Sequence, residues 1–285
     1  MLEVLAPEEI TLGDNDHLHT SVYIPTFQDY TYRPDAWKGL SSKVRRRQRA
    51  QEFIFEWDES EDDERLIEIA EIAIGQTQDW FAKDNNEDCS MRALDLSSSL
   101  QCFVDHCRSN LVNIRSYKLK LSAAHGPSAT RCPLWHADSV PIRWIQSYLG
   151  PGCVYLNEDE FGSFKDNEFD PLLQRVRNSD IDVETKRLGD NWKQKLVERS
   201  GISISQSPTG EAAMLVGRLW PFVSNKARPT MGPTAGVLHR SPHNIPRGQD
   251  RILLNLDVVC HSNSESNQDQ KENHHDHSNC DCAKC

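Results

Sequence analysis

The sequence has no hydrophobic run long enough to cross a membrane. Nowhere in its 285 residues does a stretch approach the roughly 18 to 20 apolar residues that a membrane helix needs. The first twenty residues contain neither Lys nor Arg and no apolar run, so no secretory signal is expected. Positive charge is also scarce, because 32 Lys and Arg face 43 Asp and Glu, and a net charge of −11 repels phosphate over most of the surface. We therefore expect a cytoplasmic protein that has no membrane partner and does not bind nucleic acid.

The chain has nine cysteines, which in a protein without an export signal indicate thiols or metal ligands rather than a disulfide framework. Six of them are scattered and are expected to be small apolar core residues: Cys89, Cys102, Cys107, Cys132, Cys153 and Cys260. The other three crowd the end of the sequence, at Cys280, Cys282 and Cys285.

Residues 261–285 contain no Val, Ile, Leu, Phe, Tyr, Trp or Met, so this segment is predicted to be a disordered tail. Close to the three terminal cysteines it holds three histidines, His274, His275 and His277. Imidazole and thiolate are the ligands that Zn(II) prefers. We expect the tail to bind zinc, and the alternative is a low-complexity segment whose His and Cys are incidental.

Apolar residues recur at helical spacing over 62–82 and 91–110, which predicts two helices. Short runs with strand character then follow, divided by Gly and Pro turns. The expected strands are 114–122, 143–149, 153–156, 212–216, 236–240 and 251–259. The charged stretch at about 162–205 is expected to be an insertion with a helix near 191–198. This order indicates an α+β fold in which N-terminal helices pack on a β-barrel.

We divide the chain into an N-terminal arm with a short basic helix (1–60), the helices and barrel (61–260) and the tail (261–285). The basic helix is expected over 43–51 and contains four arginines, Arg45, Arg46, Arg47 and Arg49. It is either a patch for nucleic acid or a solvated face balanced by the acidic run at 58–64. We favour the solvated face.

The strongest chemical signal is the pair His136 and Asp138, which project to the same side if their segment is extended. An imidazole and a carboxylate placed in this way can be two of the ligands of a metal site. His239 is the best candidate for the third ligand. If the segment of His239 and the strand that begins at Arg251 form a hairpin, Arg251 returns beside the metal and presents a guanidinium that binds a carboxylate at two points. Two His and one carboxylate are the facial triad of non-haem Fe(II) oxygenases.

The order His136-x-Asp138, His239 and Arg251 resembles the pattern of the 2-oxoglutarate/Fe(II) dioxygenase superfamily. The chain is also similar to an uncharacterised bacterial family, a domain of unknown function found near zinc-responsive genes. The shared segments are Cys132-Pro133-Leu134-Trp135-His136-Ala137-Asp138, Tyr148-Leu149-Gly150-Pro151-Gly152, His239-Arg240-Ser241-Pro242 and Arg251-Ile252-Leu253-Leu254.

The resemblance implies a double-stranded β-helix, the barrel of jelly rolls and cupins. It also implies that His136, Asp138 and His239 hold Fe(II), that Arg251 pairs with the far carboxylate of 2-oxoglutarate, and that Tyr148 adds a hydrogen bond to this cosubstrate. Each residue has a structural alternative. His136 and Asp138 could be a hydrogen-bonded pair, His239 a core histidine, and Arg251 the partner of Asp250 or Asp257.

Two functions therefore compete. The first is an Fe(II)/2-oxoglutarate-type oxygenase that acts on a small molecule or a protein. The second is a non-catalytic zinc or metal homeostasis protein that buffers or delivers metal through its tail. The sequence does not identify the substrate, because substrate contacts in such barrels come from variable loops.

Overall fold

A large antiparallel sheet forms the centre of the molecule. The computed structural model describes residues 22–23, 32–60, 63–82, 86–130, 132–156, 170–219, 236–243 and 245–260. Within them the large sheet has the strand order β1-β7-β4-β9-β3-β2, and a small antiparallel sheet has the order β6-β5-β8. The large sheet contains β1 (Val22–Tyr23), β2 (Gln51–Asp58), β3 (Ile114–His125), β4 (Ile142–Leu149), β7 (Ala212–Val216) and β9 (Asp250–Cys260). The small sheet contains β5 (Val154–Leu156), β6 (Ile204–Gln206) and β8 (His239–Arg240).

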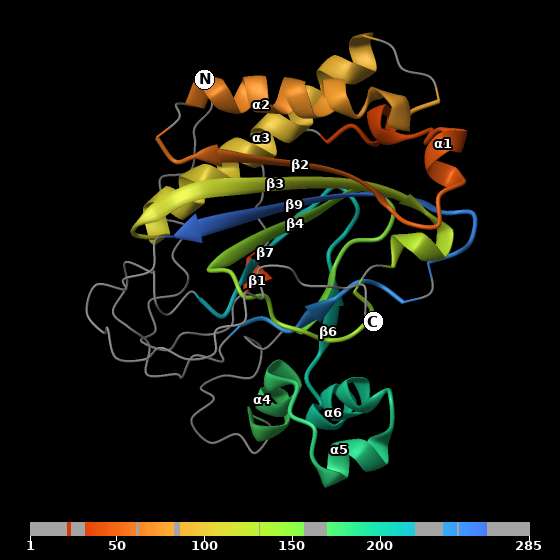
Figure 1. The fold of residues 1–285 in the computed structure, drawn as a ribbon, viewed down its shortest axis with the longest axis vertical. Helices are drawn as coiled ribbons and strands as arrows, with labels where there is room; N and C mark the ends of the chain where they lie inside the picture. Colours follow the sequence, from red (N-terminus) through yellow and green to blue (C-terminus); the bar gives the residue numbers. More distant parts are fainter. Residues whose placement is uncertain are drawn as a thin grey trace.

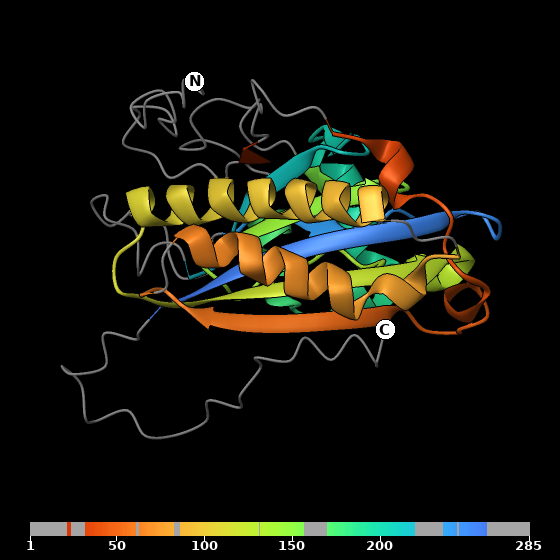
Figure 2. The same cartoon turned by 90° about the horizontal axis from the view of Figure 1, so that it is seen from above.

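Two helices, α2 (Asp63–Gln76) and α3 (Asn86–Asn110), cover one face of the large sheet (Figures 1 and 2). Acidic residues occupy the first turn of each helix, where the helix dipole favours negative charge. The buried stripe of α3 includes Leu96, Leu100 and Phe103, which pack against the sheet. Three short 3₁₀ helices are also described, η2 (Pro34–Trp37), η3 (Gln78–Trp80) and η4 (Gly126–Ala129).

The two faces of β4 have different roles, because successive side chains of a strand point to opposite sides. Trp144 faces the helices, and its ring lies 6.4 Å from that of Phe103 in an edge-on contact. The preceding residue, Arg143, faces the other side of the sheet and contacts Asp138. The helix-facing side is therefore a hydrophobic core, and the opposite side carries charged groups.

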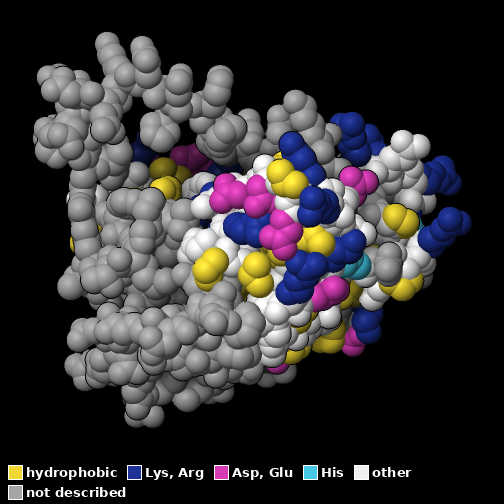
Figure 3. All heavy atoms as spheres, turned by 90° about the horizontal axis from the view of Figure 1, so that it is seen from below, with side chains coloured by type: hydrophobic (Ala, Val, Ile, Leu, Met, Phe, Trp, Pro, Cys, Tyr) yellow, Lys and Arg dark blue, Asp and Glu magenta, His cyan; other side chains and the backbone are white. Residues whose placement is uncertain are grey.

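The described residues of the predicted insertion form three short helices, where the sequence had indicated one. They are α4 (Asp170–Asn178), α5 (Val183–Leu188) and α6 (Trp192–Ser200), and they lie on the far side of the small sheet from α2 and α3 (Figure 1). A second hydrophobic core joins α4 and α6 to Leu156, Leu238 and Trp135. Seen from below, acidic and basic side chains intermingle over these helices (Figure 3), and Arg175 pairs there with Asp182 and Glu184.

The predicted basic helix over 43–51 is wrong in extent, because only α1 (Ser42–Arg45) is helical. The chain then enters β2, an edge strand that pairs with β3 along its whole length, so part of the predicted arm belongs to the sheet. At about 3.3 Å per residue, β2 keeps the basic segment roughly 26 Å from the acidic run at 58–64. The arginines at 45–49 are exposed, as expected for a solvated face; Arg45 pairs with Asp250, and Glu59 and Asp63 of the acidic run pair with Arg108.

The other predicted elements agree with the structure to within a few residues, apart from the strand over 236–240, of which only β8 forms. Mixed helix and antiparallel sheet confirm the α+β class, and the closed jelly-roll barrel stays a prediction. Among the described helices, none has the length and apolar character needed to cross a membrane. The predicted tail at 261–285, with its six proposed zinc ligands, lies outside the described residues.

Candidate metal centre

His136 and His239 are held side by side by their own backbones. His136 lies in the loop between η4 and β4, and His239 begins β8. The two residues form an antiparallel bridge in which each backbone N–H donates to the carbonyl of the other, at 3.1 and 2.9 Å. Their imidazole rings lie side by side, with centroids 4.4 Å apart and planes inclined by 49°. The bridge therefore brings together two ligands that are far apart in the sequence.

Asp138 completes the cluster from the same segment as His136. One carboxylate oxygen, Oδ2, lies 3.0 Å from Nε2 of His239, and the other, Oδ1, lies 3.8 Å from Nε2 of His136. One ligand atom from each of the three residues lies within 4.8 Å of the others. The structure thus brings together all three residues that the sequence analysis proposed as metal ligands.

The hydrogen bonds of the two histidines determine which ring nitrogen is available. Nδ1 of His136 lies 2.9 Å from the carbonyl of Leu134, and Nδ1 of His239 lies 3.0 Å from the carbonyl of Val237. A carbonyl oxygen only accepts hydrogen bonds, so each Nδ1 carries a proton, and Nε2 is the nitrogen of each ring that can offer a lone pair to a metal. Metal-binding histidines are oriented by the same kind of bond from the second nitrogen.

These donor atoms fit a divalent metal ion. Two Nε2 lone pairs and a carboxylate oxygen face one another, and Asp138 Oδ2 is buried without forming a hydrogen bond. Three such groups in this proximity can hold a cation between them. Two ligand atoms that lie about 2.1 Å from a metal, at right angles to each other, are about 3 Å apart. The separation between Asp138 and His239 matches that value. Two imidazoles and one carboxylate suit Fe(II), Mn(II), Ni(II) and Zn(II).

Arg143 is a charged neighbour of the site that the sequence analysis missed. Its Nη1 lies 2.8 Å from Oδ1 of Asp138, while its other two nitrogens bind Asp257 at 2.6 and 2.7 Å. Burial by itself would raise the pKa of Asp138, but Arg143 and then the neighbouring histidines hold it well below its usual range. Asp138 is therefore ionised, as a metal ligand must be. The available signal was a single charged residue in a strand that contains no other.

Comparison with known proteins identifies a family for most of the chain. A family described as "Protein of unknown function (DUF1826)" matches residues 45–257. The chain belongs to the DUF1826 family. No curated protein matches it.

Two solved structures are similar to this DUF1826 chain at low sequence identity. The crystal structure of a dioxygenase for auxin oxidation (DAO) in rice has 9% identity and a TM-score of 0.37, and the match covers 74% of this chain and 56% of that one. EctD from S. alaskensis in its apoform has 10% identity and a TM-score of 0.30, with 84% and 85% covered. The chain thus matches little more than half the length of the rice protein. A function for this chain has to come from the site itself.

Arg251 is buried at the start of β9, with 3% of its surface exposed. It does not return through a hairpin as expected, because β8 pairs with β5 while β9 pairs with β3 and β4. Its Nε donates to the carbonyl of Pro151 at 2.9 Å and its Nη1 to that of Ala129 at 3.0 Å. Of the two acids considered as its partners, Asp250 binds Arg45 and His125, and Asp257 binds Arg143.

The turn after β4 explains why glycine precedes Pro151. Gly150 has φ = 78°, which disfavours other residues, and a Cβ there would lie 2.6 Å from the carbonyl oxygen of Asp250. Only glycine lets the turn approach β9 closely enough for Pro151 to accept the hydrogen bond from Arg251. Gly150 and Pro151 therefore help to position Arg251.

Tyr148 is not brought to the site. It faces α2 and α3 with Trp144, on the side of β4 opposite to Arg143. Its ring stacks on Trp37 at 4.0 Å, and its hydroxyl lies 3.0 Å from Ser99 Oγ. The expected contact with a cosubstrate is therefore replaced by contacts in the helix-sheet core.

Proposed function

We propose that this chain is a metal-dependent oxygenase of the Fe(II)/2-oxoglutarate type with a double-stranded β-helix barrel. The observation that supports this is the convergence of His136, Asp138 and His239, which each offer one ligand atom within 4.8 Å of the others. Three protein ligands on one side of a metal leave positions open for a cosubstrate, O₂ and water. When bound, Fe(II) with 2-oxoglutarate and O₂ supplies the oxidising chemistry, in which the keto acid is converted to succinate and CO₂.

The protein holds the ligands in surroundings of unequal exposure. The side chains of Asp138 and His239 are 7% and 4% exposed, whereas that of His136 is 22% exposed. The buried pair excludes water from the inner part of the site. Cosubstrate and substrate would therefore approach from the side of His136.

Arg251 is assigned to the far carboxylate of 2-oxoglutarate. A guanidinium has five N–H donors, so Arg251 can bind two backbone carbonyls and a carboxylate together. The charges of Arg251 and Asp138 both act on the thiol pKa of the buried Cys153, which lies between the strand of Arg251 and the triad segment in the chain. If a keto acid is held by the triad, its far carboxylate would pair with this arginine.

Anaerobic titration tests this function. Fe(II) and 2-oxoglutarate together should produce a weak visible charge-transfer band that neither gives alone. His136→Ala should abolish the band, and Arg251→Ala should shift the keto acid titration to higher concentration. His243→Ala is the matched control, because this exposed histidine lies outside the triad. The absence of both the band and succinate formation would contradict an oxygenase.

Metal homeostasis is the second proposal, and it depends on the sequence of the tail. Three histidines and three cysteines within residues 274–285 offer enough imidazole and thiolate to wrap around Zn(II). In this case metal ions are the partners of the chain, and the barrel site is structural or regulatory. Deletion of the tail separates the two functions.

A further inference from the structure

We propose that Arg143 is a positioning residue that makes Asp138 bind metal through a single oxygen, and that Asp257 holds Arg143 in place. This inference rests on the metal site of the proposed function but not on its chemistry. No cosubstrate or substrate is required for it.

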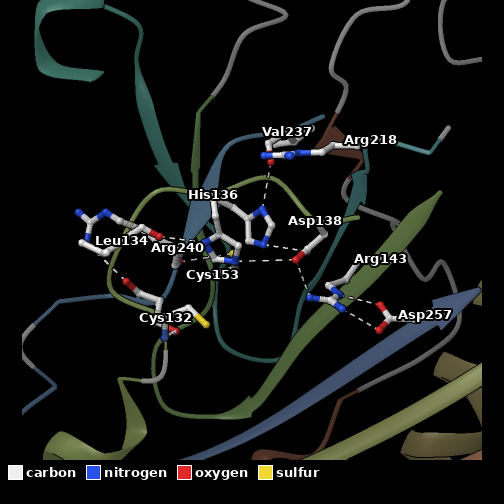
Figure 4. Close-up of polar contacts among 12 residues, drawn as sticks. Cys132, Leu134, His136, Asp138, Arg143, Cys153, Arg218, Val237, Arg240 and Asp257 are labelled. Carbon is white, nitrogen blue, oxygen red and sulfur yellow. Dashed lines mark hydrogen bonds and ion pairs between the residues drawn. The ribbon is translucent and has the colours of Figure 1, made fainter. Parts of the chain in front are cut away.

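The guanidinium of Arg143 is fixed from two sides. Arg143 on β4 and Asp257 on β9 are direct partners in the sheet register. Nε and Nη2 of Arg143 bind the two oxygens of Asp257 at 2.6 and 2.7 Å, which is the two-point geometry of a guanidinium and a carboxylate. The third nitrogen, Nη1, then points at Asp138 (Figure 4). Because the guanidinium is planar, its two-point contact with Asp257, called the clamp below, fixes the direction in which Nη1 donates.

The two oxygens of Asp138 are consequently in different surroundings. Oδ1 lies 2.8 Å from Nη1 of Arg143, whereas Oδ2 is buried, makes no hydrogen bond and lies 3.0 Å from Nε2 of His239. With Oδ1 held by Arg143, Oδ2 is the oxygen that faces the metal. A carboxylate that turned and bound through both oxygens would occupy a position that a cosubstrate needs.

The positive charge of Arg143 is shared between the carboxylates of Asp138 and Asp257. This sharing preserves the affinity of Asp138 for a metal ion. Arg143 contacts two carboxylates, so the three groups carry a net charge of −1. If Asp257 were neutral, Arg143 would cancel the charge of Asp138 and weaken its attraction for a cation. Asp257 therefore contributes both the orientation of Arg143 and the negative charge of the site.

Co(II) is the probe for the test, because its visible spectrum reports coordination geometry and its binding can be measured by calorimetry without turnover. Arg143→Lys keeps the charge but loses the clamp, and we expect about 10- to 100-fold weaker Co(II) binding with an altered spectrum. Asp257→Asn should lower the affinity in the same direction. In the double variant, the fold-loss of Co(II) affinity should be no larger than the product of the two single losses. It should be smaller than that product if both residues act through the ion pair that they form with each other.

Glu52→Gln is the matched control. Glu52 and Lys120 form an ion pair at 2.9 Å between β2 and β3 of the same sheet, so the variant removes a cross-strand charge pair away from the triad. It should bind Co(II) like the wild type. An affinity loss as large as that of Arg143→Lys would mean that the effect comes from general loosening of the sheet, and would overturn the proposal.

His239→Ala separates this inference from the proposed function. Co(II) bound by residues 261–285 is counted as a separate class of site, identified by its loss in the Cys280→Ser, Cys282→Ser, Cys285→Ser variant. If His239→Ala keeps the remaining Co(II) site of the wild type, the triad is not a metal site and both proposals fail. If His239→Ala loses that site but the Arg143 and Asp257 variants keep it with wild-type affinity and spectrum, only the role of Arg143 is refuted. Should Arg143→Lys fail to fold, Asp257→Asn decides alone, since it leaves Arg143 in the chain.

Discussion

His136 and His239 exchange both of their backbone hydrogen bonds, so the position of each metal ligand depends on the other. The same bridge lets each ring donate from Nδ1 to a carbonyl two residues earlier in its own segment. Both rings thereby present Nε2 without help from any other part of the chain. The geometry of the site is thus built into two short segments, which the β-sheets hold against each other.

Metal binding should stabilise the protein through these three ligands. A ligand at 100 times its dissociation constant stabilises the folded state by about 2.7 kcal/mol, so saturating Mn(II) should raise the Tm of the wild type. His136→Ala, Asp138→Ala and His239→Ala should each remove this rise. Thermal unfolding with and without Mn(II) measures it, and His243→Ala should behave as the wild type. A full rise in the His239→Ala variant would show that the metal binds elsewhere.

Tyr148→Phe should reduce stability without affecting the cosubstrate. The variant loses the hydroxyl contact with Ser99 but keeps the stacking on Trp37, and a buried hydrogen bond contributes about 1 kcal/mol. We expect a loss of this size in urea unfolding and an unchanged keto acid titration. Weaker 2-oxoglutarate binding with unchanged Fe(II) affinity would instead place Tyr148 at the site.

Two of the three candidate metal ligands could be predicted from sequence because their signal is local. His136 and Asp138 are two residues apart, and alternate residues of an extended segment share a side. The prediction that Tyr148 contacts a cosubstrate was wrong for the same reason. Alternate residues share a face, so Tyr148, five residues after Arg143, points to the other face of β4. The pairing of Arg143 with Asp257 depends on which strands become neighbours, and that is decided by the tertiary fold. The pattern along the chain contains no equivalent signal.

The fold was predictable where the hydrophobic period was clear. The periodic stripe over 91–110 gave α3, and alternation over 114–122 gave β3. The strand β2 was missed because the arginines before it suggested a helix, while the strand itself depends on pairing with β3. Likewise, β8 and β9 are consecutive but join different sheets, so a hairpin was the wrong interpretation.

Cys153 should make the folded state less stable at alkaline pH. Burial raises the pKa of its thiol to about 12, although the charge of Arg251 opposes this. Above about pH 9 the unfolded chain loses the thiol proton while the folded protein keeps it, so the free energy of unfolding falls as pH rises, by about 1.4 kcal/mol per pH unit. The window runs from about pH 9 to pH 12.

Cys153→Ala removes that contribution. The stability difference between wild type and variant should therefore shrink with pH above 9, even though the variant pays a constant cost for its smaller side chain. Urea unfolding of the metal-free proteins at pH 8, 9 and 10 gives this difference. A difference that stays constant across the three pH values would contradict the prediction.

Deleting residues 261–285 should remove high-affinity zinc binding and leave the rest of the protein folded. The described buried core ends before this segment, with Val258 as its last fully buried apolar residue, so the deletion removes none of the packing seen in the structure. The tail carries six of the proposed ligands, and His136, Asp138 and His239 remain in the truncated chain. Calorimetry should show one class of zinc site lost and one kept, with an unchanged Tm.

A full-length variant in which only Cys280, Cys282 and Cys285 are changed to Ser controls for chain length and should lose the same site. Equal zinc stoichiometry and affinity in truncated and full-length protein would exclude the tail as a metal binder, and leave the triad as the site that explains metal binding.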